Sequence, residues 1–585
     1  MPIPAHLARL QNRRALASSG ASGENRASAT TAPSPAGAAA TPSAVPPQDG
    51  LPAEVPQALR RFLRGWADAP FLPEGMRPQI PQLVEAKNPT DPPKLPADKW
   101  RGTPGERRVL VVGGGIAGMS AALELAERGY KVKIVEKKDY LGGRLHERLE
   151  KTPEGDFKVE HGLHMWFENY HVFKNIRHRL GVNHNFRPYE AVHFAFRDYK
   201  PEKLSSDPPV YPANLVNLIL QSPNLSLKDA IEQFRGLSEV MYYNHDKIYA
   251  KYDGVTFKEW AEEKGISKKF YEIILEPAAS VTLNDPDKVS AAEMIQFMHT
   301  YFLSQPAAMN REVTTTDHGT ALIEPWADRL RSMDVDIETG RGVGGLRFED
   351  GKAVGEVGDD TEYDHVILAT SIPGTKKVLE TATADSDSVD GLKALQEVTE
   401  PMKVAPPYQV LRLWLDKAPD DRPDVLETPQ HPPIHLIANF SLLEDEAKEW
   451  SKKNGGAVLE LHLYDSPELQ GKKPEEIWKN VRGTLEEIWP EMQGANAKAL
   501  TVTDEEDFTS YEVGQATLRP DSLAPERLGV PNMSFAGDWV KTDYPSALME
   551  RSVATGREAA NAILLRDGVR QVDIPVNRKH GPGLI

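Results

Sequence analysis

Cysteine is absent from all 585 residues. This absence excludes disulfides, cysteine nucleophiles, iron–sulfur clusters held by thiolates and a cofactor tethered through cysteine. Long apolar runs are missing as well, so the sequence predicts no membrane-spanning helix, which needs about 18 or more apolar residues. Basic residues are fewer than acidic ones: the chain has 69 Lys and Arg and 86 Asp and Glu, which gives a formal net charge of −17. Because nucleic acids are bound by basic surfaces, this balance argues against nucleic acid as a partner.

Motifs for metal sites and for hydrolysis are also missing. The 16 histidines are nowhere spaced as metal ligands, and neither the HExxH pattern nor a GxSxG elbow occurs. The sequence therefore predicts no metal, and it gives no support to a serine hydrolase.

The first hundred residues differ in composition from the rest of the chain. Residues 1–50 are rich in Ala, Ser, Pro, Thr and Gly, which predicts a disordered tail. Their excess of arginine also suits a transit peptide, so both interpretations stay open. Within residues 51–104, a helical apolar stripe from Val55 to Trp66 carries three arginines and precedes a proline-rich linker. Such a helix either lies on a membrane surface or packs on the folded protein.

A glycine-rich turn between a predicted strand and a predicted helix is the most informative feature present. Four apolar residues, Val109–Val112, run directly into Gly113, Gly115 and Gly118, and an amphipathic stretch follows from Met119 to Arg128. In a GxGxxG turn, the glycines allow a tight bend, close approach to a pyrophosphate, and close packing of helix on strand. The helix N-terminus then offers free N–H groups to the phosphates.

A second predicted strand, Lys131–Val135, ends at Glu136. An acidic residue at this distance from the glycine turn reaches a ribose hydroxyl in dinucleotide-binding proteins. It favours an adenosine with a free 2′-hydroxyl, as in FAD or NAD, and argues against NADP.

The residues that follow choose between FAD and NAD. The segment Asp139–Arg144 ends in Gly142-Gly143-Arg144 and resembles the FAD-containing amine oxidase and carotenoid desaturase superfamily, in which a Gly-Gly-Arg passes close to the flavin and the pyrophosphate. The resemblance implies FAD as the cofactor. It also implies a set of cofactor contacts, namely Gly113, Gly115, Ile116, Ala117, Gly118, Glu136, Lys137, Gly142, Gly143, Arg144, Gly162, Leu163, His164, Val343, Ala369, Gly537, Asp538, Ala547 and Met549.

Further segments resemble plant-type phytoene and ζ-carotene desaturases, and the likeness extends in order over residues 107–565. They are Glu160–Phe167, Tyr211–Leu215, Asp253–Phe257, Phe535–Trp539 and Tyr544–Glu550. In that family the second of these belongs to the substrate-entry and membrane-contact region. One departure is Ala547–Arg551, which has an extra residue and is more similar to the desaturase/methylase branch that makes aromatic carotenoid rings.

Interleaved helical and strand patterns predict an α/β chain. The expected strands are Asp334–Glu338, His365–Ala369, Gln409–Leu415, Ile434–Phe440 and a half-buried Val458–Tyr464. The expected helices are Val172–Leu180, Leu227–Tyr243, Phe257–Glu263, Ser290–Leu303, Ala321–Ser332, Pro474–Trp489 and Pro545–Leu565.

The cofactor motifs lie near both ends of the folded part, which predicts a discontinuous Rossmann-type FAD-binding domain with an inserted α+β substrate domain. We assign residues 105–190, 311–380 and 515–566 to the first domain, and 191–310 and 381–514 to the second. Residues 567–585 form a C-terminal extension.

The resemblance implies an FAD-dependent oxidoreductase that desaturates a carotenoid or related polyprenoid by hydride transfer to the flavin. Weak candidates for a catalytic role are His164 and Arg144. The expected partners are an apolar polyene, a quinone or dioxygen as electron acceptor, and a membrane surface. That surface would be a cytoplasmic face, or lie in a plastid if the N-terminus is a transit peptide. Alternatives are an amine oxidase, a hydroxysqualene-type dehydroxylase, or a non-enzymatic prenyl-binding protein.

Overall fold

The computed structural model describes residues 106–581 except 206–216, 218, 234–235 and 306. The described residues all belong to one compact unit, Pro56–Ile585. The predicted tail, the amphipathic helix with its linker, and the segment Tyr211–Leu215 lie outside the described residues.

Five parallel strands form one sheet, in the order β10-β2-β1-β13-β20. The strands are β1 (Arg108–Val112), β2 (Lys131–Val135), β10 (Asp336–Glu338), β13 (His365–Leu368) and β20 (Met533–Phe535). They come from widely separated parts of the sequence, so this sheet is discontinuous along the chain. Since the strands are parallel, the loops after them meet at one edge, where ligands bind in open α/β sheets.

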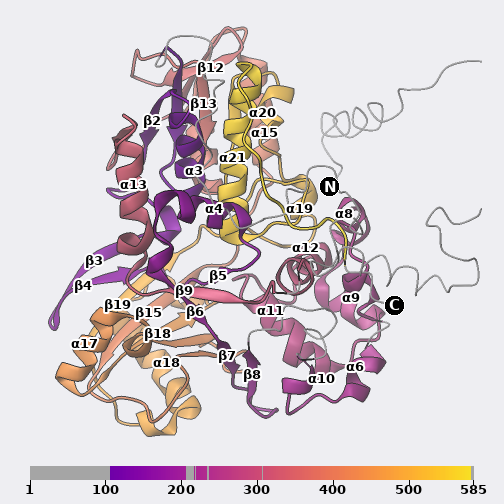
Figure 1. Ribbon diagram of the computed structural model, residues 1–585, viewed down its shortest axis with the longest axis vertical. Helices are drawn as coiled ribbons and strands as arrows, with labels where there is room; N and C mark the ends of the chain where they lie inside the picture. The colour runs from indigo at the N-terminus through magenta and orange to yellow at the C-terminus, as the bar shows by residue number, and fades with distance from the viewer. Residues whose placement is uncertain (1–105, 206–216, 218, 234–235, 306, 582–585) are drawn as a thin grey trace, which may run out of the picture. The chain divides into compact units, whose positions relative to one another are not determined.

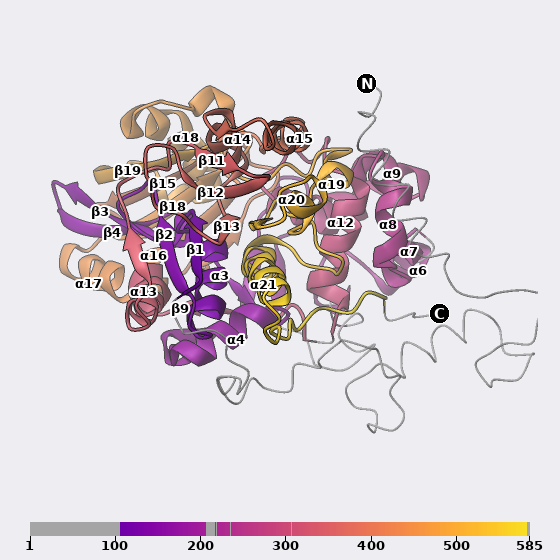
Figure 2. The same ribbon diagram turned by 90° about the horizontal axis from the view of Figure 1, so that it is seen from above.

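Helices α3 (Ile116–Ala126) and α21 (Leu548–Arg566) lie side by side, indigo against yellow in Figures 1 and 2. Gly556 permits this approach, because a Cβ there would lie 2.2 Å from the carbonyl oxygen of Ala117. The predicted amphipathic character of the first helix is wrong. Every residue of α3 is buried, including Glu124, because α21 and α4 (His171–Leu180) cover its polar side.

A second sheet has seven strands in the order β19-β15-β18-β17-β16-β7-β8. Their bounds are β7 Ala191–Phe194, β8 Glu202–Ser205, β15 Tyr408–Leu415, β16 Val425–Glu427, β17 Leu436–Asn439, β18 Ala457–Leu463 and β19 Ala497–Glu505. One face, with Leu411 and Leu461, packs on α18 (Pro474–Ile488). The opposite face carries the polar residues of β18.

The predicted half-burial of β18 is wrong, because all seven of its residues are buried. Its alternation of apolar and polar residues has another cause. Glu460 and His462 face a buried polar network with Arg412 of β15 instead of water. Alternation of apolar and polar residues thus shows that the two faces of a strand differ. It does not by itself show that the polar face is exposed to solvent.

The helices depart from the sequence expectations in three places. The predicted helix Ala321–Ser332 begins within the π-helical turn η6 (Gly319–Ile323) and continues as α13 (Glu324–Arg331). The predicted helix Leu227–Tyr243 is two helices, α6 (Leu227–Gln233) and α7 (Ser238–Met241). Between them Gly236 packs so tightly that a Cβ would lie 2.4 Å from the side chain of Ile266. The predicted helix Ser290–Leu303 is α12 (Ala291–Met298) followed by the π-helical turn η5 (His299–Leu303).

The remaining described elements have these bounds: η2 Gly143–Leu145, β3 Glu147–Thr152, β4 Gly155–Glu160, β5 Trp166–Phe167, η3 Asn183–Asn185, β6 Phe186–Tyr189, α8 His245–Tyr252, α9 Phe257–Glu263, α10 Lys268–Phe270, η4 Tyr271–Leu275, α11 Glu276–Ser280, β9 Arg311–Thr314, η6 Gly319–Ile323, α13 Glu324–Arg331, β11 Leu346–Glu349, β12 Lys352–Glu356, α14 Ile372–Glu380, β14 Thr383–Ala384, α15 Val389–Thr399, α16 Phe440–Leu443, α17 Asp445–Asn454, η7 Pro467–Leu469, η8 Pro490–Met492, α19 Gln515–Leu518 and α20 Ala524–Arg527. Among the described helices, none combines the length and apolar character needed to cross a bilayer.

The chain after α21 returns over the helical part as an extended segment. Arg578 accepts a hydrogen bond from the His299 ring at 2.7 Å through its carbonyl oxygen, and the N–H of His245 donates to the carbonyl of Lys579 at 3.0 Å. The buried amide of Asn577 donates to the carbonyls of Asn169 and Pro545, both at 3.3 Å. The C-terminal extension is therefore part of the packed structure.

We expect Asn577→Ala to lower the free energy of unfolding by about 1–3 kcal/mol, because it leaves buried carbonyl groups without a donor. Urea denaturation followed by circular dichroism measures the change. Arg570→Ala, at an exposed position of the same segment, is the control and should have almost no effect. Equal stabilities of the two variants would contradict the packing role of Asn577.

Candidate functional site

The turn between β1 and α3 is built so that only glycine fits at two positions. Gly113 has φ +109°, and a Cβ there would lie 2.5 Å from the carbonyl oxygen of Ala369. A Cβ on Gly118 would lie 2.1 Å from the carbonyl oxygen of Gly113. Gly115 is the N-cap of α3 and has no side chain to satisfy the first N–H groups of the helix. The amides of Ile116 and Ala117 are therefore available to an anion at this end.

A second glycine loop lies directly against the first. Gly115 and Gly142 form a parallel bridge, and the N–H of Gly142 donates to the carbonyl of Gly114 at 2.9 Å. A Cβ added to Gly115 would come within 3.9 Å of the Cα of Gly143. The two loops thus meet backbone to backbone, and beside Gly115 they leave a space that no side chain fills.

Glu136, at the end of β2, is buried and holds the first loop in place. Its carboxylate accepts from the N–H of Gly114 at 2.7 Å and from the N–H of Lys138 at 2.9 Å. The loop after β10 runs alongside, since the N–H of Arg341 donates to the Glu136 carbonyl at 3.2 Å. This loop carries Val343, and a Cβ on its Gly342 would lie 3.4 Å from the Cβ of Lys137.

Arg144 and Asp538 form an ion pair of 2.7 Å that joins the Gly-Gly-Arg loop to the loop after β20. Burial by itself would lower the pKa of Arg144, but Asp538 and Asp507 raise it above its usual value, so the guanidinium stays charged. Its Nη1 is buried and has no hydrogen-bond partner among the described residues. A charged donor without a partner is costly to bury, and it fits a site that receives an anionic or polar group.

The loop after β20 turns at Gly537, which has φ +146°. The N–H of Gly537 donates to Thr555 Oγ1 at 3.0 Å, which ties this turn to α21. At the start of α21, Ala547 is the N-cap and Met549 lies in the first turn. Between them Leu548 has φ +52°, a conformation that is rare for a residue with a Cβ and that occurs at the extra residue noted in the sequence.

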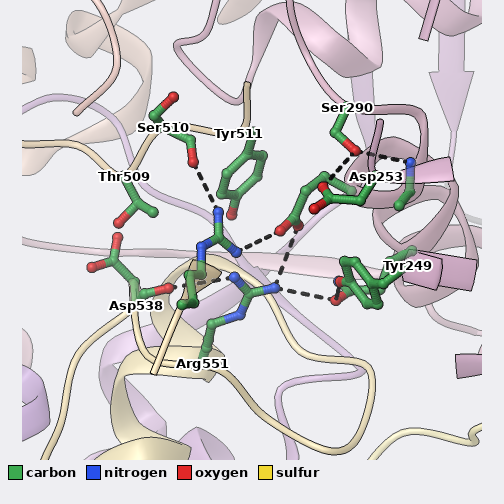
Figure 3. A network of polar contacts seen from close by, with 12 residues as sticks. Tyr249, Asp253, Ser290, Thr509, Ser510, Tyr511, Asp538 and Arg551 are labelled. Atoms are coloured by element: carbon green, nitrogen blue, oxygen red, sulfur yellow. Dashed lines mark hydrogen bonds and ion pairs between the residues drawn. The ribbon is translucent and has the colours of Figure 1, made fainter. Parts of the chain in front are cut away.

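A buried network supports these loops from behind (Figure 3). Arg551 donates to the carbonyl oxygens of Ser546 at 2.8 Å and Asp538 at 3.4 Å, and its Nη2 lies 3.6 Å from Glu293 Oε2. Arg519 pairs with the same glutamate at 2.5 Å. Arg551, where the sequence departs from the family pattern, therefore fixes the start of α21 relative to the Gly-Asp turn.

The segment after β4 brings two predicted histidines to the same region. His161 Nε2 lies 2.6 Å from the hydroxyl of Tyr408, and His164 Nδ1 lies 2.8 Å from the carbonyl oxygen of Gly162. Burial, together with His318, lowers the pKa of His164 to about 3, and Arg144 acts in the same direction. His164 is therefore neutral at physiological pH, with Nδ1 donating to Gly162 and a basic Nε2.

The N–H of Leu163 donates to Glu460 Oε1 at 2.9 Å, which fixes this segment to β18. Gly162, with φ +122°, packs on His462, whose ring carbon would lie 3.1 Å from a Cβ there. The second sheet thus supplies polar groups beneath residues 160–164.

The loops after β1, β2, β10, β13 and β20 bring most of the predicted contact residues to one edge of the parallel sheet. Several important residues were not predicted from the sequence. They are Glu293, Gln296, Arg412, Glu460 and His462. A signal existed for the first two, since a charged and an amide side chain interrupt the otherwise apolar run Ala291–Met298. Nothing in the sequence indicated that Arg412 and Glu460 belong to the site, because their strands are distant in sequence from each other and from the cofactor motifs.

The arrangement fits FAD. Two facing glycine loops, the free amides at the start of α3 and the unpartnered Nη1 of Arg144 suit a dinucleotide pyrophosphate. Glu136 is placed beside the first loop, as a ribose-binding acid is.

Comparisons with known proteins agree with this assignment. The family model described as flavin containing amine oxidoreductase matches residues 116–564. The carotenoid phi-ring synthases of Chlorobaculum tepidum and Streptomyces griseus are 25% and 29% identical, each over 81% of this chain and 91% of the relative. The probable zeta-carotene desaturase of Synechococcus elongatus is 24% identical, over 78% of this chain and 98% of the relative.

Among solved structures, cyclohexylamine oxidase from Brevibacterium oxydans superposes with a TM-score of 0.56 at 15% identity. The match covers 79% of this chain and 99% of the oxidase. At this identity the likeness shows the fold alone, a mixed α/β architecture shared with flavin-dependent oxidoreductases.

Proposed function

Because this chain belongs to the family of flavin-containing amine oxidoreductases and is an FAD-dependent oxidoreductase, we propose that it oxidises a carotenoid. The curated relatives that support this substrate class are carotenoid phi-ring synthases and carotene desaturases, matched over most of their length. The proposed substrate is therefore an apolar polyene, and the reaction removes hydride and proton to create double bonds.

We further propose that the parallel sheet is a Rossmann-type FAD-binding domain, made of residues 105–190, 311–380 and 515–566, and that residues 191–310 and 381–514 form the substrate domain. Bound FAD would accept a hydride from the substrate. Around it, Arg144 would bind the cofactor through Nη1, and the amides of Ile116 and Ala117 would bind the pyrophosphate. The neutral His164 would remain a hydrogen-bonding group beside the reacting atoms.

Two types of carotenoid oxidation are compatible with this site, and ring aromatisation is favoured over desaturation of a linear chain. The observation that carries this preference is the start of α21, where Ala547-Leu548-Met549-Glu550-Arg551 has an extra residue. Leu548 takes φ +52°, and Arg551 holds the resulting turn through Ser546 and Asp538. The identity of the Streptomyces griseus phi-ring synthase, 29% against 24% for the zeta-carotene desaturase, supports the same choice.

The reaction types are distinguished by mixing the yellow holoprotein anaerobically with liposomes that carry β-carotene, ζ-carotene, phytoene or a squalene-type lipid. Primary amines are the control. Loss of flavin absorbance with β-carotene, with an aromatic end ring in the product by mass spectrometry, is the expected result. Bleaching only by ζ-carotene or phytoene would make the protein a linear desaturase. Bleaching only by amines would overturn the carotenoid proposal.

We propose peripheral contact with a membrane, on its cytoplasmic face or in a plastid, because a polyene resides in the bilayer. Large apolar side chains are exposed in and near α6, at Leu220, Leu227 and Ile231, with exposed fractions of 70%, 56% and 67%. Liposome flotation tests the contact. A quinone or dioxygen would reoxidise the flavin.

Glu136→Ala is expected to weaken FAD binding by about 1.5–3 kcal/mol, which is the usual effect of losing hydrogen bonds to a charged group. The dissociation constant is measured from quenching of flavin fluorescence. Since Glu136 also binds the amides of Gly114 and Lys138, the melting temperature of the apoprotein is recorded in parallel. The exposed Asp139→Ala is the control. An unchanged dissociation constant would show that Glu136 is not at the ribose.

A further inference from the structure

Beneath residues 160–164, three glutamates surround one arginine in the protein interior. Arg412 Nη2 lies 2.8 Å from Glu460 Oε2 and 3.4 Å from Glu160 Oε2, and Arg412 Nη1 lies 3.7 Å from Glu444 Oε2. The exposed fractions of the Glu160 and Glu460 side chains are 1% and 0%. One guanidinium cannot neutralise three carboxylates, and an unpaired buried charge is strongly disfavoured. The cluster is therefore expected to bind at least one proton.

Glu460 is the carboxylate that stays charged. Burial by itself would raise its pKa, but Arg412 and His462 lower it to about 2. Glu160 and Glu444 behave in the opposite way. Burial raises the pKa of both above the ordinary value, and the like charges of Glu160 and Glu460 raise the pKa of Glu444 further. The proton therefore belongs to the Glu160–Glu444 pair.

His318 connects this pair with the candidate site. Its Nε2 lies 3.3 Å from Glu160 Oε1, and its ring packs edge-on against the ring of His164 at 5.2 Å between centroids. The side chain is 2% exposed, and its Nδ1 has no hydrogen-bond partner among the described residues. Burial lowers the pKa of His318 to about 4, so the ring is neutral and one of its nitrogens is unprotonated. It therefore passes a proton on instead of keeping it. An imidazole with Nε2 beside Glu160 and a free Nδ1 can receive a proton on one nitrogen and deliver one from the other.

We propose that Glu160 and Glu444 form a buried proton-binding pair that accepts, through His318, the proton released by the reaction at residues 160–164. The inference rests on the proposed oxidation. When a double bond forms, one carbon loses a hydride, whose two electrons reduce the flavin, and the adjacent carbon loses a proton. Glu444 holds the resting proton of the pair, and Glu160, which lies beside His318, binds the released one. The substrate thus loses two hydrogens, one as the hydride and one as this proton.

A row of hydrogen-bonded side chains on β18 extends from the same cluster in the direction away from residues 160–164. On β18, Glu460 Oε1 lies 2.8 Å from His462 Nε2, and His462 Nδ1 lies 2.8 Å from the hydroxyl of Tyr464. Tyr464 lines an open cavity of about 330 Å³ together with His435 and Asp465. The polar row of β18 thus runs from the acid cluster to the wall of a cavity that water can enter.

Every packed element contributes charged or titratable groups that affect the pair. They are Lys158 of β4, Asp317 and His318 before η6, Arg412 of β15, Glu446 of α17, and Glu460 and His462 of β18. Only Arg412 and Lys158 are permanently positive, and Arg412 is bound most closely by Glu460. The groups around the pair therefore leave an excess of negative charge, and a bound proton reduces it.

Infrared spectroscopy of the full-length holoprotein tests the pair without substrate. In pH difference spectra from about pH 5 to pH 9, the band of protonated carboxyls is expected to include one group that titrates above about pH 6. Glu160→Gln should lower the midpoint of the remaining Glu444 by at least about one unit, because it removes the like charge, and Glu444→Gln should remove the titration of Glu444 from the band. Glu449→Gln, exposed on α17, is the control. Glu550 and Glu558, whose pKa values are about 7, titrate in every variant and cancel in the comparison.

Reduction with dithionite at about pH 8 tests whether the pair responds to the site. Wild-type protein and Glu449→Gln should gain a protonated-carboxyl band when the flavin is reduced, and Glu160→Gln should not. Spectra of Glu444→Gln and Glu160→Gln that match wild type in the titration would overturn the pair. A titrating pair that gains no band on reduction would overturn its role in the reaction. Neither arm uses a carotenoid, so a failure of the proposed substrate would appear in the liposome assay and not here.

Discussion

Gly115→Trp is expected to yield folded protein that contains no flavin. Gly115 lies at the point where the turn after β1 faces the Gly-Gly-Arg loop, and a Cβ there would be 3.9 Å from the Cα of Gly143. An indole attached at this position would fill the space between the two loops. The pyrophosphate would then lose its close approach to the backbone and to the amides of α3.

The measurement is the ratio of flavin absorbance at visible wavelengths to protein absorbance after purification, with circular dichroism to show that the fold is kept. Gly115→Ala is the matched control, since a methyl group at 3.9 Å makes ordinary van der Waals contact and φ is −70°. We expect this variant to retain most of its flavin. Normal flavin content in Gly115→Trp would show that FAD does not lie between these loops.

Glu124→Gln is expected to destabilise the protein by about 3–5 kcal/mol, the usual result of removing one partner from a buried ion pair. Glu124 Oε1 lies 2.8 Å from Arg557 of α21 and 2.5 Å from Arg179 of α4, and Oε2 lies 3.2 Å from Arg128. The side chain is fully buried. Glutamine keeps the shape but removes the charge that three guanidiniums share where three helices meet. Arg179 keeps a second carboxylate, Glu127, at 2.5 Å, whereas Arg128 and Arg557 lose the carboxylate that they bind in Glu124.

The effect of this substitution should depend on pH. Burial by itself would raise the pKa of Glu124, but Arg557, Arg179 and Arg128 lower it from about 4.5 to about 2. A carboxyl whose pKa is lower in the folded state stabilises the folded protein at pH values above its pKa in the unfolded state. That stabilisation disappears as the pH falls from about 4.5 to about 2. The pKa difference corresponds to about 3 kcal/mol. The gap in stability between wild type and Glu124→Gln should therefore narrow in acid.

Urea denaturation at about pH 7 and about pH 3 measures this gap. Glu324→Gln is the control, because its ion pair with Lys158 is 3.2 Å long but its side chain is 59% exposed. Exposed pairs contribute about 0–1 kcal/mol, so this variant should stay close to wild type at both values. A similar small effect in Glu124→Gln would show that the three arginines find other partners.

The turn between β1 and α3 was predictable because its determinants are local. Gly118 packs on Gly113 within the same turn, and the motif contains both glycines within six residues. The contact of Gly113 with Ala369, by contrast, is non-local. The FAD-binding residues that follow the other parallel strands came from the resemblance, and the sheet order explains why they meet. The division into domains and the role of each cofactor contact stay predictions.

Burial, by contrast, could not be predicted where polar residues alternate with apolar ones. The sequence of β18 is typical of a half-buried strand, yet Glu460 faces Arg412. The stretch that contains Glu124 is typical of an amphipathic helix, yet α4 and α21 cover it. In both cases the partner that makes a buried charge tolerable lies far away in the chain.

The sequence by itself determined the dinucleotide-binding turn, because its glycines and flanking apolar residues act over short distances. The cofactor and the family came from the resemblance of its motifs to a known family. Only the tertiary structure decided which charges are buried together, such as Glu160 with Glu444 and Arg412, and Glu293 with Arg519 and Arg551. The physical reason is that the energy of a buried charge depends on every group within a few ångströms, whatever its position in the chain.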